Sequence, residues 1–309
     1  MEKRSLGSLH VSEVGVGCNN FGGRLDQVAA SQVVLGALDA GINFFDTADI
    51  YGGTQSEVML GRALGTRRAE AVIATKFGMP IDDQRVGARP QYVHQACEDS
   101  LRRLDTDYID LYQLHFPDES VPIADTLGAL RELVEVGKVQ EIGCSNLTAA
   151  QLVEAKAAAG DGPAFVTVQN QFSLLAREPE RDGVLEACDD MGLGFLPFYP
   201  LANGLLTGKF RPGEPIPDGT RLALMAPDRK VHWLSDDFRG RVASLLAYAD
   251  EIEVPILSLA FSWLLSHRQV RSVIAGASTA AQVRANARAV RELDVAVIAR
   301  LNELTSHSS

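Results

Sequence analysis

The sequence predicts an α/β protein folded as a (β/α)8 TIM barrel. The first observation is that short apolar segments alternate with helix-like segments along most of the 309 residues. The second is that these apolar segments are nearly continuous, as expected for strands buried on both faces of a parallel sheet. Eight such repeats favour a closed barrel over an open sheet. The eight predicted strands are residues 11–17, 42–46, 71–76, 108–115, 139–146, 165–170, 193–200 and 270–276.

Helix-starting residues stand between the predicted strands. Thr54 with Glu57, and Thr148 with Gln151, have the spacing of a capping box. Asp26 is a predicted N-cap for the first barrel helix. The segments between strands are therefore expected to be helices that cover the sheet.

Both ends of the chain carry further elements. Turn residues at 6–8 predict an N-terminal hairpin before the barrel, and the apolar pattern after residue 292 predicts a C-terminal helix. The Gly- and Pro-rich stretch 203–233 is long for a connection within a compact domain, which is typical of a functional loop. No linker or low-complexity segment interrupts the chain, so we expect one domain over residues 1–309.

Composition excludes several classes of function. The net charge of −11 and the absence of a Lys/Arg cluster argue against a nucleic-acid partner. No apolar run reaches the roughly 18 residues of a membrane span, and the first residues do not form a signal peptide. The four cysteines lie far apart without metal-ligand spacing, so the sequence predicts no metal site and no disulfide framework. A cytoplasmic location is expected.

Polar residues end three of the apolar strands. Asp46, Lys76 and His115 terminate strands in which a polar residue is costly to bury, and Tyr51 follows Asp46 by five residues. The carboxyl ends of barrel strands form one rim, where barrel enzymes carry their sites. An ammonium next to a phenol lowers the phenol pKa, and a neutral imidazole can hydrogen-bond a carbonyl oxygen. The set therefore predicts protonation of an oxygen on which negative charge develops.

Each of these residues also has an ordinary structural explanation. The Asp–Lys pair could be a salt bridge, the histidine a satisfied core residue and the tyrosine a packing aromatic. Their convergence on one rim favours the functional interpretation. Other barrel chemistries fit less well, because there is no HxH motif for a metal and only one clear carboxylate where a glycosidase needs two. Residues 15–23 do not form the GxGxxG of a Rossmann fold.

Six segments in order resemble the aldo-keto reductase family over nearly the whole chain. They are NFFDTADIYGGTQSE (43–57), ATKFG (74–78), SLRRLDTDYIDLYQLHFPD (100–118), EIGCSN (141–146), YPLANGLLTGK (199–209) and IAGASTAAQVRAN (274–286). The resemblance implies a catalytic tetrad of Asp46, Tyr51, Lys76 and His115, with Tyr51 as general acid. It also implies an extended NADP(H), bound without a Rossmann domain, that reduces an aldehyde or ketone.

The resemblance also implies the cofactor contacts. Ser145, Asn146 and Gln169 would bind the nicotinamide carboxamide, and Tyr199 would stack on the ring. The backbone around Leu201, Gly204 and Leu205, with Lys209, would hold the pyrophosphate. The adenosine and its 2′-phosphate would contact Gly276, Ser278, Thr279, Gln282 and Asn286.

Two parts of the pocket depart from this pattern or leave it open. The adenosine segment offers only Arg284 as a cation for the 2′-phosphate, so NAD(H) stays as the alternative cofactor. For the substrate, Phe21 and Phe116, with Trp233, are expected to form an apolar wall. Asn19 and Asn20 would add polar contacts, which favours a hydroxylated small-molecule carbonyl substrate.

Two alternative functions stay open at this point. One is an NAD(P)-dependent sugar dehydrogenase that works in the oxidative direction, which the shortage of 2′-phosphate cations favours. The other is a nicotinamide-sensing partner module with little turnover, because potassium-channel beta subunits resemble the same family. Neither a membrane partner nor a nucleic acid is expected, and a homo-oligomer remains compatible with the sequence.

Overall fold

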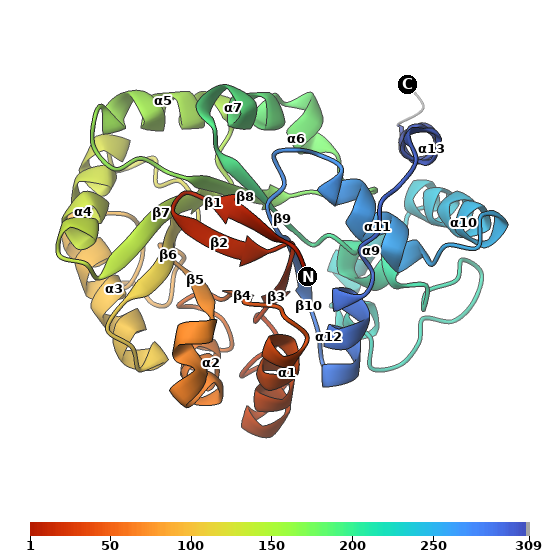
Figure 1. The fold of residues 1–309 in the computed structure, drawn as a ribbon, viewed down its shortest axis with the longest axis horizontal. Helices are drawn as coiled ribbons and strands as arrows, with labels where there is room; N and C mark the ends of the chain where they lie inside the picture. The colour runs from red at the N-terminus through yellow and green to blue at the C-terminus, as the bar shows by residue number, and fades with distance from the viewer. Residues whose placement is uncertain (307–309) are drawn as a thin grey trace.

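A parallel β-barrel surrounded by helices forms the body of the protein in the computed structural model, which describes residues 1–306 (Figure 1). The strand order in the eight-stranded sheet is β10-β3-β4-β5-β6-β7-β8-β9, and all neighbours are parallel. The strands are β3 (Val14–Gly17), β4 (Phe44–Asp46), β5 (Val72–Phe77), β6 (Ile109–Leu114), β7 (Val139–Ser145), β8 (Thr167–Gln171), β9 (Gly194–Phe198) and β10 (Val273–Gly276). All eight predicted strands are confirmed, with the first shortened to its second half.

The barrel is closed between β9 and β10 by a short parallel bridge. Phe195 pairs with Val270, its N–H donates to the Gln269 carbonyl at 2.7 Å, and the Arg271 N–H donates to the Phe195 carbonyl at 3.0 Å. These bonds satisfy the backbone of β9, which would otherwise be an exposed edge. The predicted (β/α)8 barrel is therefore confirmed.

The predicted hairpin closes the amino-terminal opening of the barrel. Strands β1 (Lys3–Leu6) and β2 (Leu9–Ser12) pair antiparallel and lie across that opening (Figure 1). Their apolar side chains pack into the barrel interior as one buried cluster. That cluster comprises Leu6, Leu9, Val11, Phe44, Ala74, Leu111, Leu196 and Ile274. The site is consequently confined to the opposite, carboxyl-terminal rim.

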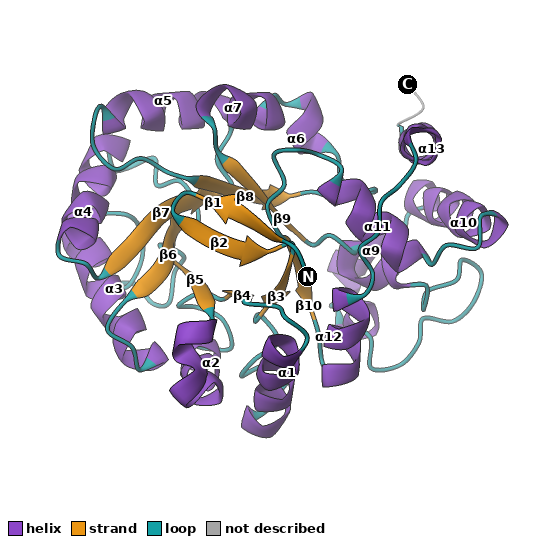
Figure 2. Cartoon of the chain, viewed as in Figure 1, coloured by secondary structure: helices purple, strands orange, loops and turns teal. Residues whose placement is uncertain are grey.

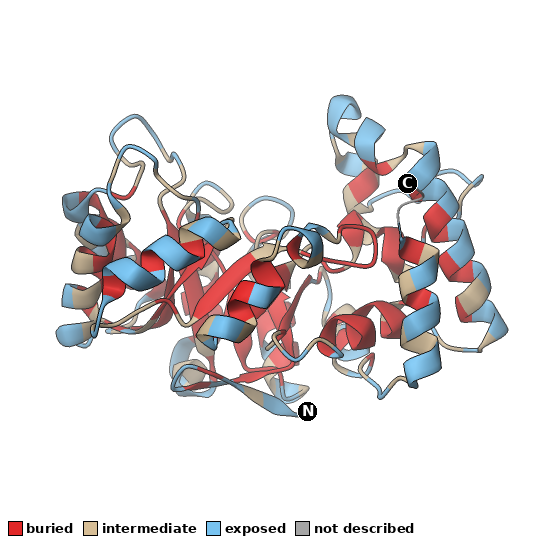
Figure 3. Ribbon diagram, turned by 90° about the horizontal axis from the view of Figure 1, so that it is seen from above, coloured by how far each residue is buried: buried red, intermediate tan, exposed pale blue. Residues whose placement is uncertain are grey.

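Helices form the outer layer around the strands (Figure 2). Those that follow the strands are α1 (Gln27–Asp39), α2 (Gln55–Leu64), α3 (Pro90–Leu104), α4 (Ile123–Glu135), α5 (Ala149–Ala159), α6 (Glu178–Arg181), α7 (Val184–Met191), α11 (Ile256–Leu265) and α12 (Ala280–Ala287). Most of them turn apolar residues to the sheet and polar residues to solvent, so buried and exposed stripes alternate along them (Figure 3), whereas α11 is buried on nearly every side. No helix within residues 1–306 is long and apolar enough to cross a membrane.

The long segment after β9 is built from short helices. It contains the 3₁₀ helix η2 (Ala202–Thr207), α8 (Arg221–Leu224) and α9 (Pro227–Trp233), and leads into α10 (Asp236–Glu251). The 3₁₀ helix η1 (Gly65–Glu70) follows α2, and the predicted C-terminal helix is α13 (Val295–Thr305), outside the barrel beside α10.

The predicted helix starts have mixed outcomes. Asp26 caps α1, and Thr148 with Gln151 forms a complete capping box on α5. The prediction for Thr54 and Glu57 is wrong, because Thr54 has φ +73° and its side chain caps nothing. Glu57 is instead fully buried, where it accepts from Thr75 at 2.5 Å and Arg103 at 2.7 Å. A buried ion pair outweighs a cap here because an unpaired buried carboxylate is costly.

Candidate active site

Lys76 lies at the centre of the carboxyl-terminal rim. Its side chain, 0% exposed at the end of β5, contacts both Asp46 from β4 and Tyr51 from the loop after β4. The ammonium is 2.8 Å from the Asp46 carboxylate, 2.8 Å from the Thr47 carbonyl and 3.5 Å from the Tyr51 hydroxyl. Burial alone would lower the pKa of Lys76, but Asp46 and Tyr51 together raise it above its usual value. The lysine is therefore a cation at neutral pH.

Tyr51 presents its hydroxyl to the pocket directly above Lys76. Its pKa is raised overall, because desolvation of the hydroxyl outweighs the opposing attraction of the Lys76 charge. The expectation that the ammonium lowers the pKa of Tyr51 is wrong in sum, although the effect of Lys76 has the expected sign. The phenol is thus protonated at neutral pH, with a cation next to it.

His115, just after β6, completes the group. Its ring meets Tyr51 edge to face at a centroid distance of 5.8 Å and stacks on Phe116 at 5.9 Å. Burial, with a smaller contribution from the Lys76 charge, lowers the pKa of His115 to about 3. The imidazole is accordingly neutral at physiological pH, as the sequence predicts, and one ring nitrogen carries a hydrogen that it can donate.

A close backbone contact fixes the loop that carries Tyr51. Gly52 has φ +58°, and a Cβ there would lie 2.2 Å from the Phe21 carbonyl. Only glycine permits this approach of the two loops. Phe21 itself is 0% exposed and belongs to the main core, so the predicted wall contact of its side chain with substrate is wrong. An aromatic ring at this position is stabilised more by full burial than by lining an open cavity.

A cavity of about 520 Å³ opens over this group and extends along the rim. Most of the predicted site residues line it. They are Asn19, Asn20, Asp46, Tyr51, His115, Phe116, Ser145, Asn146, Gln169, Tyr199, Leu201, Gly204, Lys209, Gly276, Ser278 and Gln282. Lys76 lies beneath its floor and reaches it through Asp46 and Tyr51.

Besides Phe21, four predicted pocket residues do not line the cavity. The side chain of Leu205 is 0% exposed in the core, so only its backbone, as the resemblance implies, could face a ligand, and Asn286 is also buried. Thr279 caps α12, where its hydroxyl accepts from the Gln282 N–H at 3.2 Å. Trp233 packs against His232 and Phe238 at 5.3 and 5.5 Å, away from the cavity, so it does not form the expected wall. Gly204 and Ser278, the neighbours of Leu205 and Thr279, line the cavity instead.

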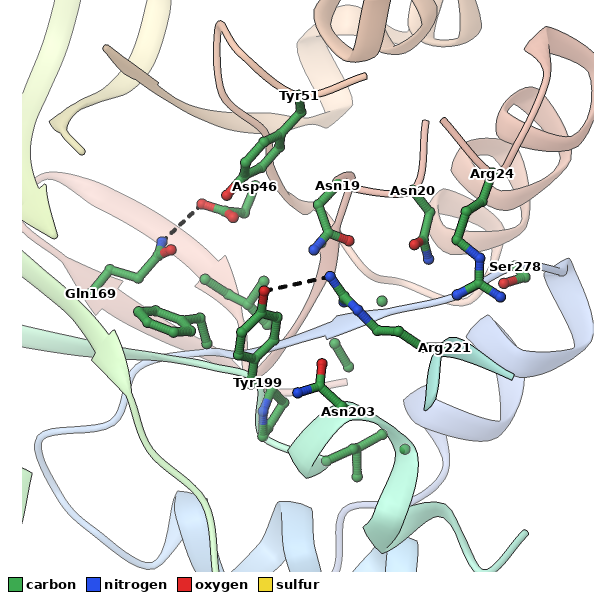
Figure 4. Close-up of a pocket in the computed structure, with 18 of the residues that line it drawn as sticks. Asn19, Asn20, Arg24, Asp46, Tyr51, Gln169, Tyr199, Asn203, Arg221 and Ser278 are labelled. Carbon is green, nitrogen blue, oxygen red and sulfur yellow. Dashed lines mark hydrogen bonds between the residues drawn. The ribbon is translucent and has the colours of Figure 1, made fainter. Parts of the chain in front are cut away.

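Amide and hydroxyl groups gather at the ends of β7 and β8. Ser145 donates to the Gln169 carbonyl at 2.7 Å, and the Asn146 amide donates to the His115 carbonyl at 3.0 Å. The Gln169 amide nitrogen donates to Asp46 at 2.8 Å, which links this group to the Asp46–Lys76 pair (Figure 4). Neutral donors and acceptors of this kind suit a carboxamide, which has one acceptor and two donor hydrogens.

Left-handed backbone conformations cluster on the same rim. Asn146 and Tyr199 have φ values of +61° and +53°, and Ala202 and Asn203 have +45° and +57°. Such residues cost about 1–3 kcal/mol each outside glycine and concentrate at functional sites. The Tyr199 conformation places its ring at the wall of the cavity (Figure 4).

Two arginines that the sequence analysis missed line the other end of the cavity. Arg24 follows β3, and Arg221 begins α8 in the long segment after β9. Arg24 donates to the Gly219 carbonyl at 2.7 Å, and Arg221 lies over the Tyr199 ring at 4.9 Å. Neither forms an ion pair with a carboxylate of residues 1–306. Partial burial, and then the charge of Arg221, lowers the pKa of Arg24.

The segment predicted to receive the adenosine faces these arginines. Gly276 lies against the side chains of Asn19 and Asn20 on the loop that leads to Arg24, and Figure 4 draws Arg24 on the same side of the cavity as Ser278. Arg284, the cation that the sequence singled out, is exposed on α12 and does not line the cavity. The sequence signal for Arg24 and Arg221 is that each basic residue stands in a glycine-containing loop after a barrel strand.

Comparison with known proteins agrees with this geometry. The family model described as "Aldo/keto reductase family" matches residues 13–306, and the chain belongs to that family. The chain is therefore an oxidoreductase, in a family of nicotinamide-dependent carbonyl reductases.

Individual relatives cover nearly the whole chain. An uncharacterized oxidoreductase, YrpG, of Bacillus subtilis is 35% identical over 98% of this chain and 96% of its own. A probable voltage-gated potassium channel subunit beta of Arabidopsis thaliana is 34% identical over 94% of this chain and 91% of its own. The solved structure of aldo-keto reductase AKR11C1 from Bacillus halodurans, in its holo form, has 31% identity and a TM-score of 0.78 and covers 98% of this chain and 96% of its own.

Proposed function

We propose that the protein, as one domain over residues 1–309, reduces a small aldehyde or ketone to the alcohol with NADPH, and that Tyr51 is the general acid. The observation that carries this proposal is the buried Asp46–Lys76 pair with the Tyr51 hydroxyl 3.5 Å from the ammonium. When bound, the nicotinamide supplies the hydride that adds to the carbonyl carbon. The residues of this chain then have to provide the proton for the carbonyl oxygen.

Tyr51 is in the protonation state that this task needs. Its raised pKa keeps the phenol protonated at neutral pH, so a proton is available to the oxygen as charge develops on it. The phenolate left after transfer is stabilised by the Lys76 ammonium, and Asp46 keeps that ammonium charged and in place. Solvent then returns a proton to Tyr51 through the open cavity.

His115 orients the carbonyl group in this proposal. With its pKa at about 3, the ring is an uncharged donor at any physiological pH. It can hydrogen-bond the carbonyl oxygen without competing with Tyr51 as an acid. Phe116, stacked on the same ring and 47% exposed, would offer an apolar face to the rest of the substrate, and Asn20 a polar contact.

The chemistry of the cavity lining fits an extended dinucleotide. Ser145, Asn146 and Gln169 would bind the carboxamide at one end, and Tyr199 would stack on the nicotinamide. Arg24 and Arg221 would bind phosphate at the other end, where two guanidiniums without carboxylate partners match a polyanion. We infer that these arginines bind the 2′-phosphate beside Ser278, which would favour NADP(H) over NAD(H) and weaken the support for the oxidative sugar dehydrogenase alternative.

Replacement of Tyr51 by Phe tests the acid assignment. Tyr51→Phe should lower kcat by about 10²- to 10⁴-fold, the usual contribution of a positioned general acid, while NADPH still binds. Steady-state turnover on an aldehyde and NADPH fluorescence titration measure the two effects separately. A variant with near wild-type kcat would show that another group donates the proton.

The similarity to potassium-channel beta subunits supports a second candidate, a nicotinamide-sensing partner module with slow chemistry. Turnover against a panel of aldehydes and ketones separates the two candidates. A reductase turns over at least one class of carbonyl with kcat of about 1 s⁻¹ or more, whereas a sensor binds NADPH and stays far below that rate throughout.

A further inference from the structure

We propose that Asp49 is a positioning residue, and that its carboxyl group must be protonated to hold the loop that carries Tyr51 in its working position. The proposal rests on the proposed function, because it assigns Asp49 a role through Tyr51. Asp49 lies two residues before Tyr51, on the back of the same loop, and does not line the cavity.

The backbone around Asp49 joins the loop to the catalytic lysine. The Asp49 N–H donates to the Lys76 carbonyl at 3.1 Å, and the Tyr51 N–H donates to the Ala48 carbonyl at 3.2 Å. The Lys76 ammonium in turn donates to the Thr47 carbonyl at 2.8 Å. Any movement of Asp49 therefore changes the position of the Tyr51 hydroxyl relative to Lys76.

The Asp49 side chain is buried without a partner. It is 0% exposed, and neither carboxyl oxygen has a hydrogen-bond partner among residues 1–306. The neighbouring Ile50 N–H lowers the pKa of the Asp49 carboxyl, but it does not meet hydrogen-bond geometry with either oxygen. A neutral carboxylic acid is tolerated in such a place far better than a carboxylate, whose burial without a partner costs several kcal/mol.

The two nearby cations, Arg103 and Lys76, form no bond with Asp49. Arg103 on α3 is bonded to Glu57 at 2.7 Å and to Ser100 at 3.2 Å. Lys76 on β5 is bonded to Asp46, Thr47 and Tyr51 on the inner side of the loop. Both cations are thus committed to other acceptors.

Of the remaining titratable neighbours, Glu57 opposes ionisation of Asp49, and Tyr92 and Tyr112 bring no positive charge. Glu57 on α2 contributes a negative charge, and the Asp49 charge raises the pKa values of Tyr92 on α3 and Tyr112 on β6. The Tyr112 hydroxyl is itself buried without a partner. Burial, and then Glu57, raises the pKa of Asp49 to about 7, against the opposing charges of Arg103 and Lys76.

Ionisation of Asp49 would therefore disturb the loop within the physiological range. Hydration of the new charge requires the loop to move away from α2 and α3, which carries Tyr51 away from Lys76. His115 and Tyr51 do not titrate in this pH range, since the pKa of His115 is about 3 and that of Tyr51 lies above its usual value. An inflection in rate between pH 6 and 8 would thus belong to Asp49.

Single-turnover hydride transfer from NADPH to an aldehyde, followed by stopped flow from pH 5.5 to 9, tests the proposal. The wild-type rate should fall about tenfold per pH unit above an inflection near 7. Asp49→Asn keeps the shape of the neutral acid, so its rate should match the wild type at pH 6 and stay level to pH 9. Glu57→Gln keeps an acceptor for Thr75 and Arg103 but removes the charge, so it should move the inflection to lower pH.

Infrared spectroscopy of the cofactor-free protein gives a readout without turnover. The carbonyl band of a buried protonated carboxyl should be present at pH 6, disappear as pH rises through about 7 and be absent from Asp49→Asn. A wild-type rate that is level from pH 6 to 8, or an inflection that persists in Asp49→Asn, would overturn the proposal. A Tyr51→Phe variant with near wild-type kcat would overturn the proposed role of Tyr51 as general acid, but it would not change the infrared result for Asp49.

Discussion

The two ends of the cavity satisfy their charges in opposite ways. At the reaction end, Lys76 is completely buried and all its bonds are to Asp46, Thr47 and Tyr51. At the far end, Arg24 and Arg221 have no carboxylate partner within residues 1–306 and repel each other. The first end is complete within the protein, whereas the second gains its counter-charge only from a ligand. Substitutions at the first end should therefore affect both stability and rate, and those at the second end binding alone.

Lys76→Met should have the largest effect. It leaves Asp46 buried without a cation, so the free energy of unfolding should fall by about 3–5 kcal/mol. It also removes the charge that stabilises the Tyr51 phenolate, so kcat should fall by about 10²- to 10⁴-fold. Urea unfolding and steady-state kinetics measure the two losses.

The double variant Asp46→Asn/Lys76→Met is the matched control. It removes the buried charge altogether, so most of the lost stability should return while activity stays low. If the single Lys76→Met variant were as stable as the wild type, the Lys76 charge would not be needed to stabilise the buried Asp46 carboxylate.

Arg24→Met and Arg221→Met should act on affinity instead. Loss of one charge-assisted contact to phosphate should raise the Kd for NADPH about 10- to 100-fold, more than that for NADH. The melting temperature should change little, because the loss of the Arg24–Gly219 hydrogen bond or of the Arg221–Tyr199 contact is offset by the loss of one repulsion. Fluorescence titration with both cofactors, and thermal unfolding without them, give these values.

Arg284→Met provides the comparison for these two variants. Arg284 is exposed on α12 and outside the cavity, so the Kd for NADPH should not change. An equal loss of affinity in Arg284→Met would indicate a general charge effect rather than a phosphate site.

Phe116→Ala should have the smallest effect. The ring is 47% exposed at the cavity mouth, so it can contribute about 1 kcal/mol of apolar contact to a substrate. We expect KM for an aromatic aldehyde to rise about fivefold, with kcat and melting temperature nearly constant. A matching fall in kcat instead would mean that the ring orients His115 through their stacking.

The fold was predictable because its signal is local and repeated. Each strand shows a short apolar run, and each helix a punctuation residue such as Asp26 or Thr148. Failures occurred where a tertiary contact overrode the local pattern. Glu57 forms an ion pair with Arg103 and does not cap a helix, and Phe21 packs in the core and does not line the pocket.

The reaction end of the site was predictable for a similar reason. Asp46, Lys76 and His115 end consecutive strands, and parallel strands of a barrel bring their carboxyl ends to one rim. The polar residue at the end of an apolar strand is therefore visible in the sequence, and so is its place in the site. The direction of the pKa shift of Tyr51 could not be predicted from the sequence, because it depends on desolvation that only packing creates.

By itself, the sequence determined the barrel, the group at the strand ends and the family resemblance, since each follows from a periodic pattern or a local motif. The phosphate end of the cavity and the environment of Asp49 depend instead on how distant segments pack together. Arg24 and Arg221 are almost two hundred residues apart in loops, where no periodicity gives the direction of a side chain. The burial of Asp49 between the loop and the helices α2 and α3 is likewise a product of packing, because desolvation depends on all the neighbours at once.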